Sequence, residues 1–150
     1  MTLIAIDPGS ASGAYALFDP KWRAPIVGDL EAVNKQLNPV FLVNILDWSG
    51  ATEAIVENVH SMPRQGVAST FRFGVAVGII HGVLSARGVP MHLVQPGVWK
   101  KALGLRGPDG EASRALAIRL YPQVDGLHLK KHHNRAEALL IGHYFREKRP

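Results

Sequence analysis

Three acidic residues lie where a charge is costly unless some chemistry uses it. Asp7 ends the apolar run "LIAI" and is followed at once by Pro-Gly, and Glu57 ends the apolar run "AIV". Glu137 lies beside the apolar stripe of the last predicted helix instead of opposite it. If carboxylates from separate segments met at one place, they would repel one another, and such oxygen-rich sites bind magnesium or manganese. An aspartate before Pro-Gly also forms ordinary turns, so Asp7 alone leaves both interpretations open.

Basic and histidine residues surround the third of these acids. His133 precedes Glu137 by four residues and Asn134 precedes it by three, so both share its helix face. They belong to the basic cluster "LKKHHNR", residues 129–135. The chain as a whole has 17 Lys and Arg against 12 Asp and Glu, a net charge of +5. This excess favours a polyanionic partner, nucleic acid above all, over a basic surface that has no partner.

The elements that must position these residues follow from the apolar pattern. Segments near the amino terminus predict an antiparallel meander of three strands, and later segments alternate between helical and extended patterns. The expected strands are residues 2–6, 13–19, 24–30, 53–57 and 91–94. The expected helices are residues 40–48, 67–87, 110–122 and 132–147, with a helix or turn at 96–105. This order predicts a mixed α/β layer architecture in which the acids converge at neighbouring strand ends.

Size and composition predict a single domain, residues 1–150. A chain of 150 residues that is 47% hydrophobic suits one core. It has no cysteine, which excludes disulfides, thiolate metal sites and a cysteine nucleophile. The start "MTLIAIDPGS" has neither a basic leader nor a long apolar segment, and the apolar runs elsewhere are too short to span a membrane. We therefore expect a cytoplasmic protein with no membrane partner.

Five motifs in a fixed order give the sequence a specific resemblance. They are "IAIDPGSASGAYALFD", "AIVENVHSMPRQGVASTFRFGVAVGIIHGVLSARG", "VPMHLVQPGVWKKALGL", "EASRALAIRLYP" and "NRAEALLIGHYFR". Together they resemble the RuvC-like Holliday-junction resolvases of the RNase H-like superfamily, and are most similar to compact phage and prophage members. The resemblance implies an α/β, RNase H-like fold with a five-stranded mixed sheet flanked by helices. It also implies a homodimer that works in a bacterial host cell.

The same resemblance implies a structure-specific endodeoxyribonuclease. Asp7, Glu57 and Glu137 would bind two divalent cations, Mg2+ or Mn2+, for hydrolysis of DNA phosphodiesters. The implied substrates are branched DNA: Holliday junctions (four-way junctions), forks and flaps. A catalytically impaired protein that binds branched DNA is the alternative function. An actin-like or sugar-kinase-like ATPase would need a second phosphate-binding domain, which 150 residues cannot supply.

The last motif departs from the family pattern at the fourth acid. Many small relatives read "DHGRAEA" or "DDGRAEA" where this chain reads "HHNRAEA", so that carboxylate is missing. His133 is the expected replacement ligand and catalytic residue, His132 is the second candidate, and Asn134 could ligate through its carbonyl oxygen. A neutral imidazole ligand favours manganese over magnesium. In the alternative interpretation the histidine pair touches only DNA phosphate or solvent.

A second departure concerns a lysine that relatives place before "EASRALA", where this chain has Gly110. Lys100, Lys101 and Arg106 remain nearby to position the scissile phosphate, and Arg114 follows in the next helix. The full set of expected DNA contacts is His60, Arg64, Lys100, Lys101, Arg106, Lys130, Lys131, His132 and Arg135.

One aromatic position of the family differs in this chain. Relatives often carry an aromatic residue after the strand-end glutamate that wedges the junction open, and this chain offers His60 or Met62 there to stack beside an unpaired base. Trp99 follows "QPGV" and precedes two lysines, so we expect it to anchor the basic loop in the core.

The long helix predicted over residues 67–87 contains a stripe of small residues. Gly74, Gly78 and Gly82 recur every four residues, although each costs about 1 kcal/mol of helix propensity. Packing on the protein's own sheet is the favoured explanation, and a dimer seam is the other. Phe71 is expected in the core or in an interface. The apolar residues expected along one side of this helix are Val67, Phe71, Val75, Ile79, Val83 and Ala86.

Overall fold

The computed structural model describes residues 1–9, 13–60 and 64–150. The strands of its main sheet are β1 (Thr2–Asp7), β2 (Gly13–Phe18), β3 (Ile26–Leu30), β6 (Ala51–Glu57) and β7 (Met91–Val94). Its helices are α1 (Pro39–Ser49), α2 (Val67–Ala86), α3 (Pro96–Ala102), α4 (Gly110–Leu120) and α5 (His133–Glu147), and a 3-10 turn, Lys130–His132, precedes α5. Each predicted strand and helix is present, with small differences at the ends.

The main sheet has five strands in the order β3-β2-β1-β6-β7, which confirms the predicted mixed sheet. β1, β2 and β3 form the antiparallel meander. β6 and β7 run parallel to β1, with α2 as the crossover between them. Because β1 and β6 are parallel neighbours, their carboxyl ends lie at the same edge of the sheet.

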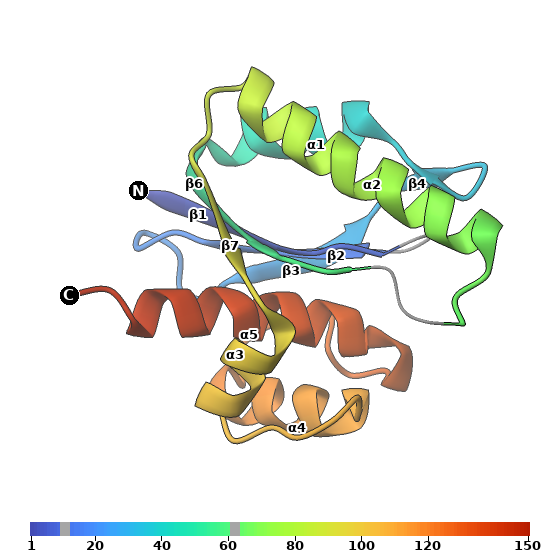
Figure 1. The fold of residues 1–150 in the computed structure, drawn as a ribbon. Coiled ribbons are helices and arrows are strands. Elements are labelled where there is room, and N and C mark those ends of the chain that lie inside the picture. Colours follow the sequence, from blue (N-terminus) through green and yellow to red (C-terminus); the bar gives the residue numbers. More distant parts are fainter. Residues whose placement is uncertain (10–12, 61–63) are drawn as a thin grey trace.

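Helices cover both faces of the sheet (Figure 1). α1 and α2 lie on one face, α5 lies on the other, and α3 and α4 pack beyond α5. Side chains alternate along β1, so Leu3 and Ala5 join the core on the α5 side, and Ile4 and Ile6 join the core under α1 and α2. One sheet therefore supports two apolar cores in a layered α/β fold.

A short hairpin between β3 and α1 was not predicted. It consists of β4 (Ala32–Val33) and β5 (Gln36–Leu37). Its turn residues, Asn34 and Lys35, have φ angles of 51° and 63°. A two-residue hairpin turn of this kind needs positive φ at both positions, which favours Asn-Gly or Asp-Gly. Lys35 is an unusual choice there, and the sequence signal for the hairpin is correspondingly weak.

The buried face of α2 differs from the predicted one. Its buried side chains are Ala76, Ile80 and Leu84. By contrast, Val67 is 88% exposed and Phe71 is 72% exposed. Of the expected stripe, Ile79 and Val83 pack against the core and are partly buried. The stripe does not mark the buried side along its whole length, because apolar residues occur on all sides of α2 and periodicity alone does not select the side that faces the sheet.

The glycine stripe of α2 faces outward. A Cβ atom added to Gly74, Gly78 or Gly82 would meet nothing within 4 Å. The expectation that these glycines pack on the protein's own sheet is therefore wrong. The stripe and the exposed Phe71 leave an apolar helix surface with no partner in the described part of the chain.

α2 also corrects the expectation about membrane-length segments. Within the described residues it is the one helix long and apolar enough to cross a membrane, a judgement of length and composition only. Gly, Ser, Thr, Arg and His residues interrupt the apolar run in α2, so no unbroken apolar segment of this length is visible in the sequence. Ala76, Ile80 and Leu84 pack into the core beneath α2, so this helix is an integral layer of the domain.

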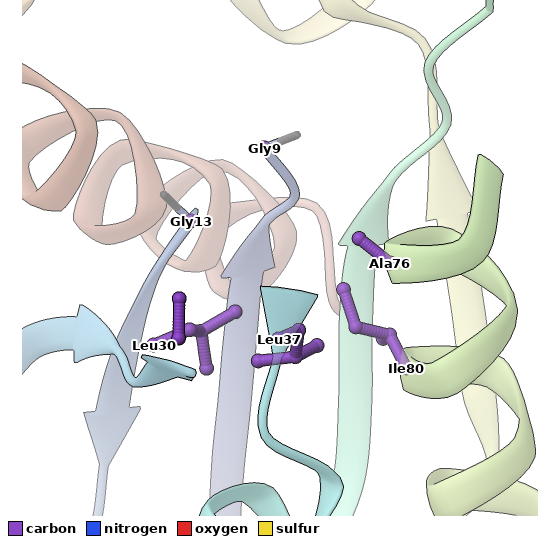
Figure 2. A pocket seen from close by; sticks show the side chains of 7 residues that line it. Gly9, Gly13, Leu30, Leu37, Ala76 and Ile80 are labelled. Atoms are coloured by element: carbon purple, nitrogen blue, oxygen red, sulfur yellow. The ribbon is translucent and has the colours of Figure 1, made fainter. Parts of the chain in front are cut away.

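A small apolar cavity lies between α2 and the ends of β1 and β2 (Figure 2). Its volume is about 10 Å³, room for about one water molecule. Its lining residues are Gly9, Gly13, Leu30, Ala32, Leu37, Ala76 and Ile80. The cavity is too small to bind a substrate. The core is therefore closely packed up to the end of β1.

Candidate active site

Strand alternation brings Asp7 and Glu57 together on one face of the sheet. Ile6 of β1 is paired with Val56 of β6, and one residue further along each strand come the two acids. Ile6 and Val56 face α1 and α2, so the next residues face α5. Both acids are buried, at 6% exposure for Asp7 and 8% for Glu57.

α5 carries the third acid across this face. The helix packs on β1 and β2. Gly142 makes the close approach possible, because a Cβ atom there would lie 3.0 Å from the Cβ of Ala5 and 2.7 Å from Cζ of Phe18. Glu137 lies more than one turn before Gly142, and its side chain is 13% exposed. The three predicted acids thus come from β1, β6 and α5.

Three further side chains hold two of these carboxylates. Trp99 donates its indole Nε1–H to Oε2 of Glu57 at 2.6 Å. The hydroxyl of Ser113 donates to Oε1 of Glu137 at 3.2 Å. The Nζ atom of Lys100 lies 3.5 Å from the same Oε1 atom. α3 and α4 therefore position the acids from outside the sheet, and Trp99 is buried as predicted.

The electrostatics of the site reflect three acids in little solvent. Burial and the negative charges of Glu57 and Glu137 raise the pKa of Asp7 well above its usual value. Burial also raises the pKa of Glu57, while the hydrogen bond from Trp99 lowers it. The Lys100 ammonium lowers the pKa of both Asp7 and Glu57. Without another cation, Lys100 is the positive charge that offsets the acids.

The donor set fits a hard divalent cation, although the acids are not drawn together around one. Within residues 1–9, 13–60 and 64–150, no three His, Asp or Glu side chains lie close enough to hold a metal ion in this arrangement. Glu137 contacts Lys100 and Ser113 instead. Carboxylate oxygens are the ligands that Mg2+ and Mn2+ prefer, and a divalent cation would relieve the repulsion that raises the pKa of Asp7.

Replacing Lys100 with methionine is expected to destabilise the metal-free protein, because the acids lose their nearest counter-charge. The Lys100 and Glu137 side chains are 20% and 13% exposed, so we expect a loss of about 1 kcal/mol, or about 2–4 °C in Tm. Lys101→Met, at the exposed neighbouring position, is the control. Thermal unfolding in EDTA measures both variants, and equal melting temperatures would contradict the role given to Lys100.

A hollow of about 640 Å³, lined by both acidic and basic side chains, opens beside Glu137. α3, α4, the 3-10 turn and the start of α5 all contribute to it. Its lining residues are Lys100, Pro108, Asp109, Gly110, Glu111, Lys130, His133, Asn134 and Glu137. Of the candidates for the fourth ligand, His133 and Asn134 therefore share the hollow with Glu137.

The two departures from the family pattern meet in space. A Cβ atom added to Gly110 would lie 2.9 Å from Cγ of His133 and 3.0 Å from its Cδ2. Any larger residue at position 110 would therefore displace the His133 imidazole. The small residue at position 110 and the histidine at position 133 are therefore sterically coupled, although they are 23 positions apart and look independent in the sequence.

His132 and Arg135 are engaged away from the hollow. His132 is buried, and its Nδ1 accepts a hydrogen bond from the backbone N–H of Leu129 at 3.1 Å. Arg135 donates from Nε and Nη2 to the two oxygens of Asp29, at 2.8 and 2.9 Å. Its Nη1 also donates to the carbonyl of Gly126 at 3.1 Å. These contacts tie the start of α5 to β3 and occupy two residues that were expected to contact DNA.

The remaining expected DNA contacts are basic or histidine side chains, of which Lys100 is half-buried and the others are exposed. Lys130 and Lys100 line the hollow. Other exposed residues are His60, Arg64, Lys101, Arg106 and Lys131. The alternative wedge residue, Met62, lies outside the described residues.

Sequence reasoning missed Ser113, Gly13 and the hydrogen bond of Trp99. A Cβ atom on Gly13 would lie 2.9 Å from the carbonyl oxygen of Asp7, so only glycine lets β2 begin so close to the strand-end acid. The segment "DPGSASG" contains two glycines at this turn, which was the available signal. No local pattern indicated that Trp99 or Ser113 would reach an acid on another element.

A five-stranded mixed sheet in this order, with acids at the ends of β1 and β6 and a third acid on the covering helix, defines the RNase H-like class of folds. RuvC of T. thermophilus in complex with a Holliday junction substrate has a TM-score of 0.72 at 15% identity, over 97% of this chain and 94% of that one. The yeast mitochondrial Holliday junction resolvase Ydc2 has a TM-score of 0.58 at 11% identity, over 95% of this chain and 78% of that one. These structures confirm the RNase H-like fold.

Curated relatives narrow this class to a family. The crossover junction endodeoxyribonuclease RuvC of Nitratidesulfovibrio vulgaris (strain Hildenborough) is 36% identical, over 69% of this chain and 66% of that protein. RuvC of strain DP4 is 34% identical over the same shares. The match thus spans just under two thirds of these relatives' length. No family model matches the chain. The chain is thus similar to RuvC over most of its own length, as the ordered motifs predicted.

Proposed function

We propose that this protein is a structure-specific endodeoxyribonuclease that cuts Holliday junctions and other branched DNA in the cytoplasm of a bacterial cell. The observation that carries the proposal is that Asp7, Glu57 and Glu137, from β1, β6 and α5, lie near enough for their charges to interact, beside a hollow that Lys100 and Lys130 help to line. An acidic centre next to positive charge suits a phosphodiester substrate, since cations neutralise the carboxylates while basic side chains bind the DNA backbone.

Asp7, Glu57 and Glu137 are the proposed metal ligands, and His133 is the proposed fourth ligand. Two divalent cations, Mg2+ or preferably Mn2+, would supply an activated water and stabilise the departing 3′ oxygen. His133 lines the same hollow as Glu137 and is held against Gly110, which supports it over the buried His132. Lys100 and Lys130 would bind the scissile strand's phosphates, and Lys101, Lys131, Arg106, Arg64 and His60 would contact the flanking DNA.

A cleavage assay on defined DNA tests the proposed function. The substrates are a labelled four-way junction, a fork, a flap and a linear duplex of the same sequence, each with EDTA, Mg2+ or Mn2+. We expect metal-dependent nicks in the branched substrates and little cleavage of the duplex, with faster cleavage in Mn2+. Junction binding without cleavage in either metal would instead support the catalytically impaired binding protein.

The open face of α2 supports a homodimer as the working form. Val67 and Phe71 are exposed, and the glycine stripe admits a close backbone approach by a second helix. In a single subunit, only 17% of the most apolar 18-residue stretch of α2 is buried. A second copy of α2 related by a twofold axis would cover this surface and present two acidic centres to the two symmetric strands of a junction.

Replacing Gly78 with glutamate is expected to convert the dimer to a monomer. The new carboxylates would face each other across the twofold seam, whereas the open space around Gly78 leaves the fold of each subunit unchanged. We expect the dimer dissociation constant to rise at least about 100-fold, equivalent to about 2.8 kcal/mol. Ala115→Glu, at an exposed position of α4, is the matched control. Sedimentation equilibrium measures all forms, and a variant that remains as dimeric as the control would contradict the seam.

A further inference from the structure

Two consecutive residues of α3 contact two of the three acids. Trp99 donates its indole N–H to Oε2 of Glu57 at 2.6 Å, and the Nζ atom of Lys100 lies 3.5 Å from Oε1 of Glu137. Consecutive side chains on a helix diverge by about 100°, so one short helix can reach carboxylates on two different elements. α3 therefore lies against the acidic centre as well as against the core.

The bond between Trp99 and Glu57 is short and almost free of solvent. Trp99 is fully buried at 0% exposure, and Glu57 is 8% exposed. An indole N–H is a donor only, and a buried donor of this kind needs an acceptor. Hydrogen bonds to carboxylates are stronger than neutral ones, and water does not compete for this one in a dry site. The bond therefore restricts rotation of the Glu57 carboxylate.

The position of the bond leaves one side of the carboxylate available. A carboxylate has two oxygens with about four lone-pair directions, and Trp99 uses one direction on Oε2. The Glu57 side chain also interacts with the Asp7 carboxyl group, the acid at the end of the neighbouring strand. A carboxylate that a buried donor holds through one oxygen, next to a second acid, has the arrangement found around metal-ligating groups, whose supporting partners fix their orientation.

We propose that Trp99 is a positioning residue for Glu57, whose indole N–H orients the carboxylate so that its second oxygen can ligate a divalent cation. This inference rests on the proposed function, and it adds a role for a residue that the apolar core would otherwise explain completely. Trp99 packs in the core among Val94, Ala117 and other buried residues. If Trp99 had only a structural role, replacing it would lower stability alone. If it positions Glu57, replacing it would also lower the metal affinity by more than the lost stability explains.

Trp99→Phe separates these roles, because it keeps an aromatic ring in the core and removes the donor. The measurement is calorimetric titration of the free protein with Mn2+, without DNA. We expect Mn2+ to bind about 10-fold more weakly than in the wild type, the lower end of the loss that follows removal of a supporting hydrogen bond. Trp48→Phe, at an exposed position, is the matched control for the same substitution. Leu116→Ala, in the same core, is the control for lowered stability without loss of this bond.

A second measurement uses the native side chain and covers the case in which Trp99→Phe fails to fold. In a Trp22→Phe/Trp48→Phe protein, the ¹⁵N-labelled indole of Trp99 gives a single N–H signal. We expect this signal to shift when Glu57 is replaced by glutamine and again when Mg2+ is added to the protein with Glu57 intact. A signal that responds to neither change would overturn the inference.

The outcomes distinguish the inference from the proposed function. If the wild type binds Mn2+ and cleaves junctions while Trp99→Phe binds Mn2+ equally well, the positioning role is wrong and the nuclease proposal stands. If Leu116→Ala binds Mn2+ as weakly as Trp99→Phe does, the positioning role is also wrong, because lost stability would then explain the weaker binding. A wild type that binds neither metal would overturn both proposals.

Discussion

Asp7→Asn is expected to abolish DNA cleavage while it stabilises the metal-free protein. The charges of Glu57 and Glu137 both act on Asp7, so a neutral amide there removes a proposed metal ligand and also two repulsive interactions. Removing a residue that only supports a metal ligand lowers activity about 10- to 100-fold. We therefore expect removal of a ligand itself to lower the cleavage rate more than about 100-fold. Junction binding by the variant should persist, because the basic side chains are unchanged. Single-turnover cleavage and gel-shift assays measure the two effects.

The stability change should depend on pH with a defined sign. The pKa of Asp7 in the folded protein is raised well above the value of 3.8 that it has in the unfolded chain. As the pH rises above about 4, the unfolded chain releases this proton first, so the metal-free folded state loses stability until the pH passes the raised pKa. Each unit by which the pKa is raised costs about 1.4 kcal/mol above that pH. Asp7→Asn should remove this loss.

Denaturant unfolding in EDTA across pH 4–8 measures this dependence. Asp125→Asn, at an exposed position, is the matched control and should follow the wild type. Addition of Mg2+ or Mn2+ should stabilise the wild type and the control at neutral pH, and should stabilise Asp7→Asn much less. A variant that cleaves junctions at a rate near that of the wild type, or that loses stability on raising the pH as the wild type does, would show that Asp7 is not the centre of the site.

Gly142→Ala is expected to be the most destabilising single-methyl change in α5. The added Cβ atom would lie 3.0 Å from the Cβ of Ala5 and 2.7 Å from Cζ of Phe18, and Ala5 belongs to the central strand. Overpacking of this kind costs about 1–3 kcal/mol, and the better helix propensity of alanine returns about 1 kcal/mol. Because the added atom would lie too close to both Ala5 and Phe18, we expect a cost at the upper end of this range and a net loss of about 2 kcal/mol, or about 4–8 °C in Tm.

The same substitution should also slow cleavage, because a shift of α5 away from the sheet moves Glu137 relative to Asp7 and Glu57. Gly97→Ala is the control: a Cβ atom there meets nothing within 4 Å, so this variant should be as stable and as active as the wild type. Thermal unfolding and junction cleavage measure both variants. A Gly142→Ala protein with unchanged stability would contradict the close packing of α5 on the sheet.

Much of the fold could be predicted from the sequence because the decisive patterns are local. Alternating apolar residues and turn residues predicted the five strands of the main sheet, and period-3.6 patterns predicted the main helices. The hairpin of β4 and β5 was missed because its turn contains Lys35 where glycine is usual. The buried side of α2 was predicted wrongly because apolar residues surround that helix, and no local period favours one side.

Part of the candidate site could likewise be predicted from the sequence, and part could not. An acid at the end of an apolar strand is a local feature, and parallel neighbours necessarily bring such ends to one edge, so Asp7 and Glu57 could be chosen from the sequence. The contacts that support these acids could not be predicted from the sequence. Trp99 reaches Glu57 across 42 residues, and Arg135 reaches Asp29 across 106 residues.

The sequence by itself predicted the order of elements, the similarity to RuvC and the three candidate acids, because these depend on residue type and on spacing along the chain. The tertiary structure alone decided which basic residues line the hollow and which side chain donates a hydrogen bond to Glu57. It also showed that Gly110 and His133 are in close contact. The physical reason is that residue type and spacing are local properties of the chain, whereas the side chain that lies opposite a given residue is set by how distant elements pack.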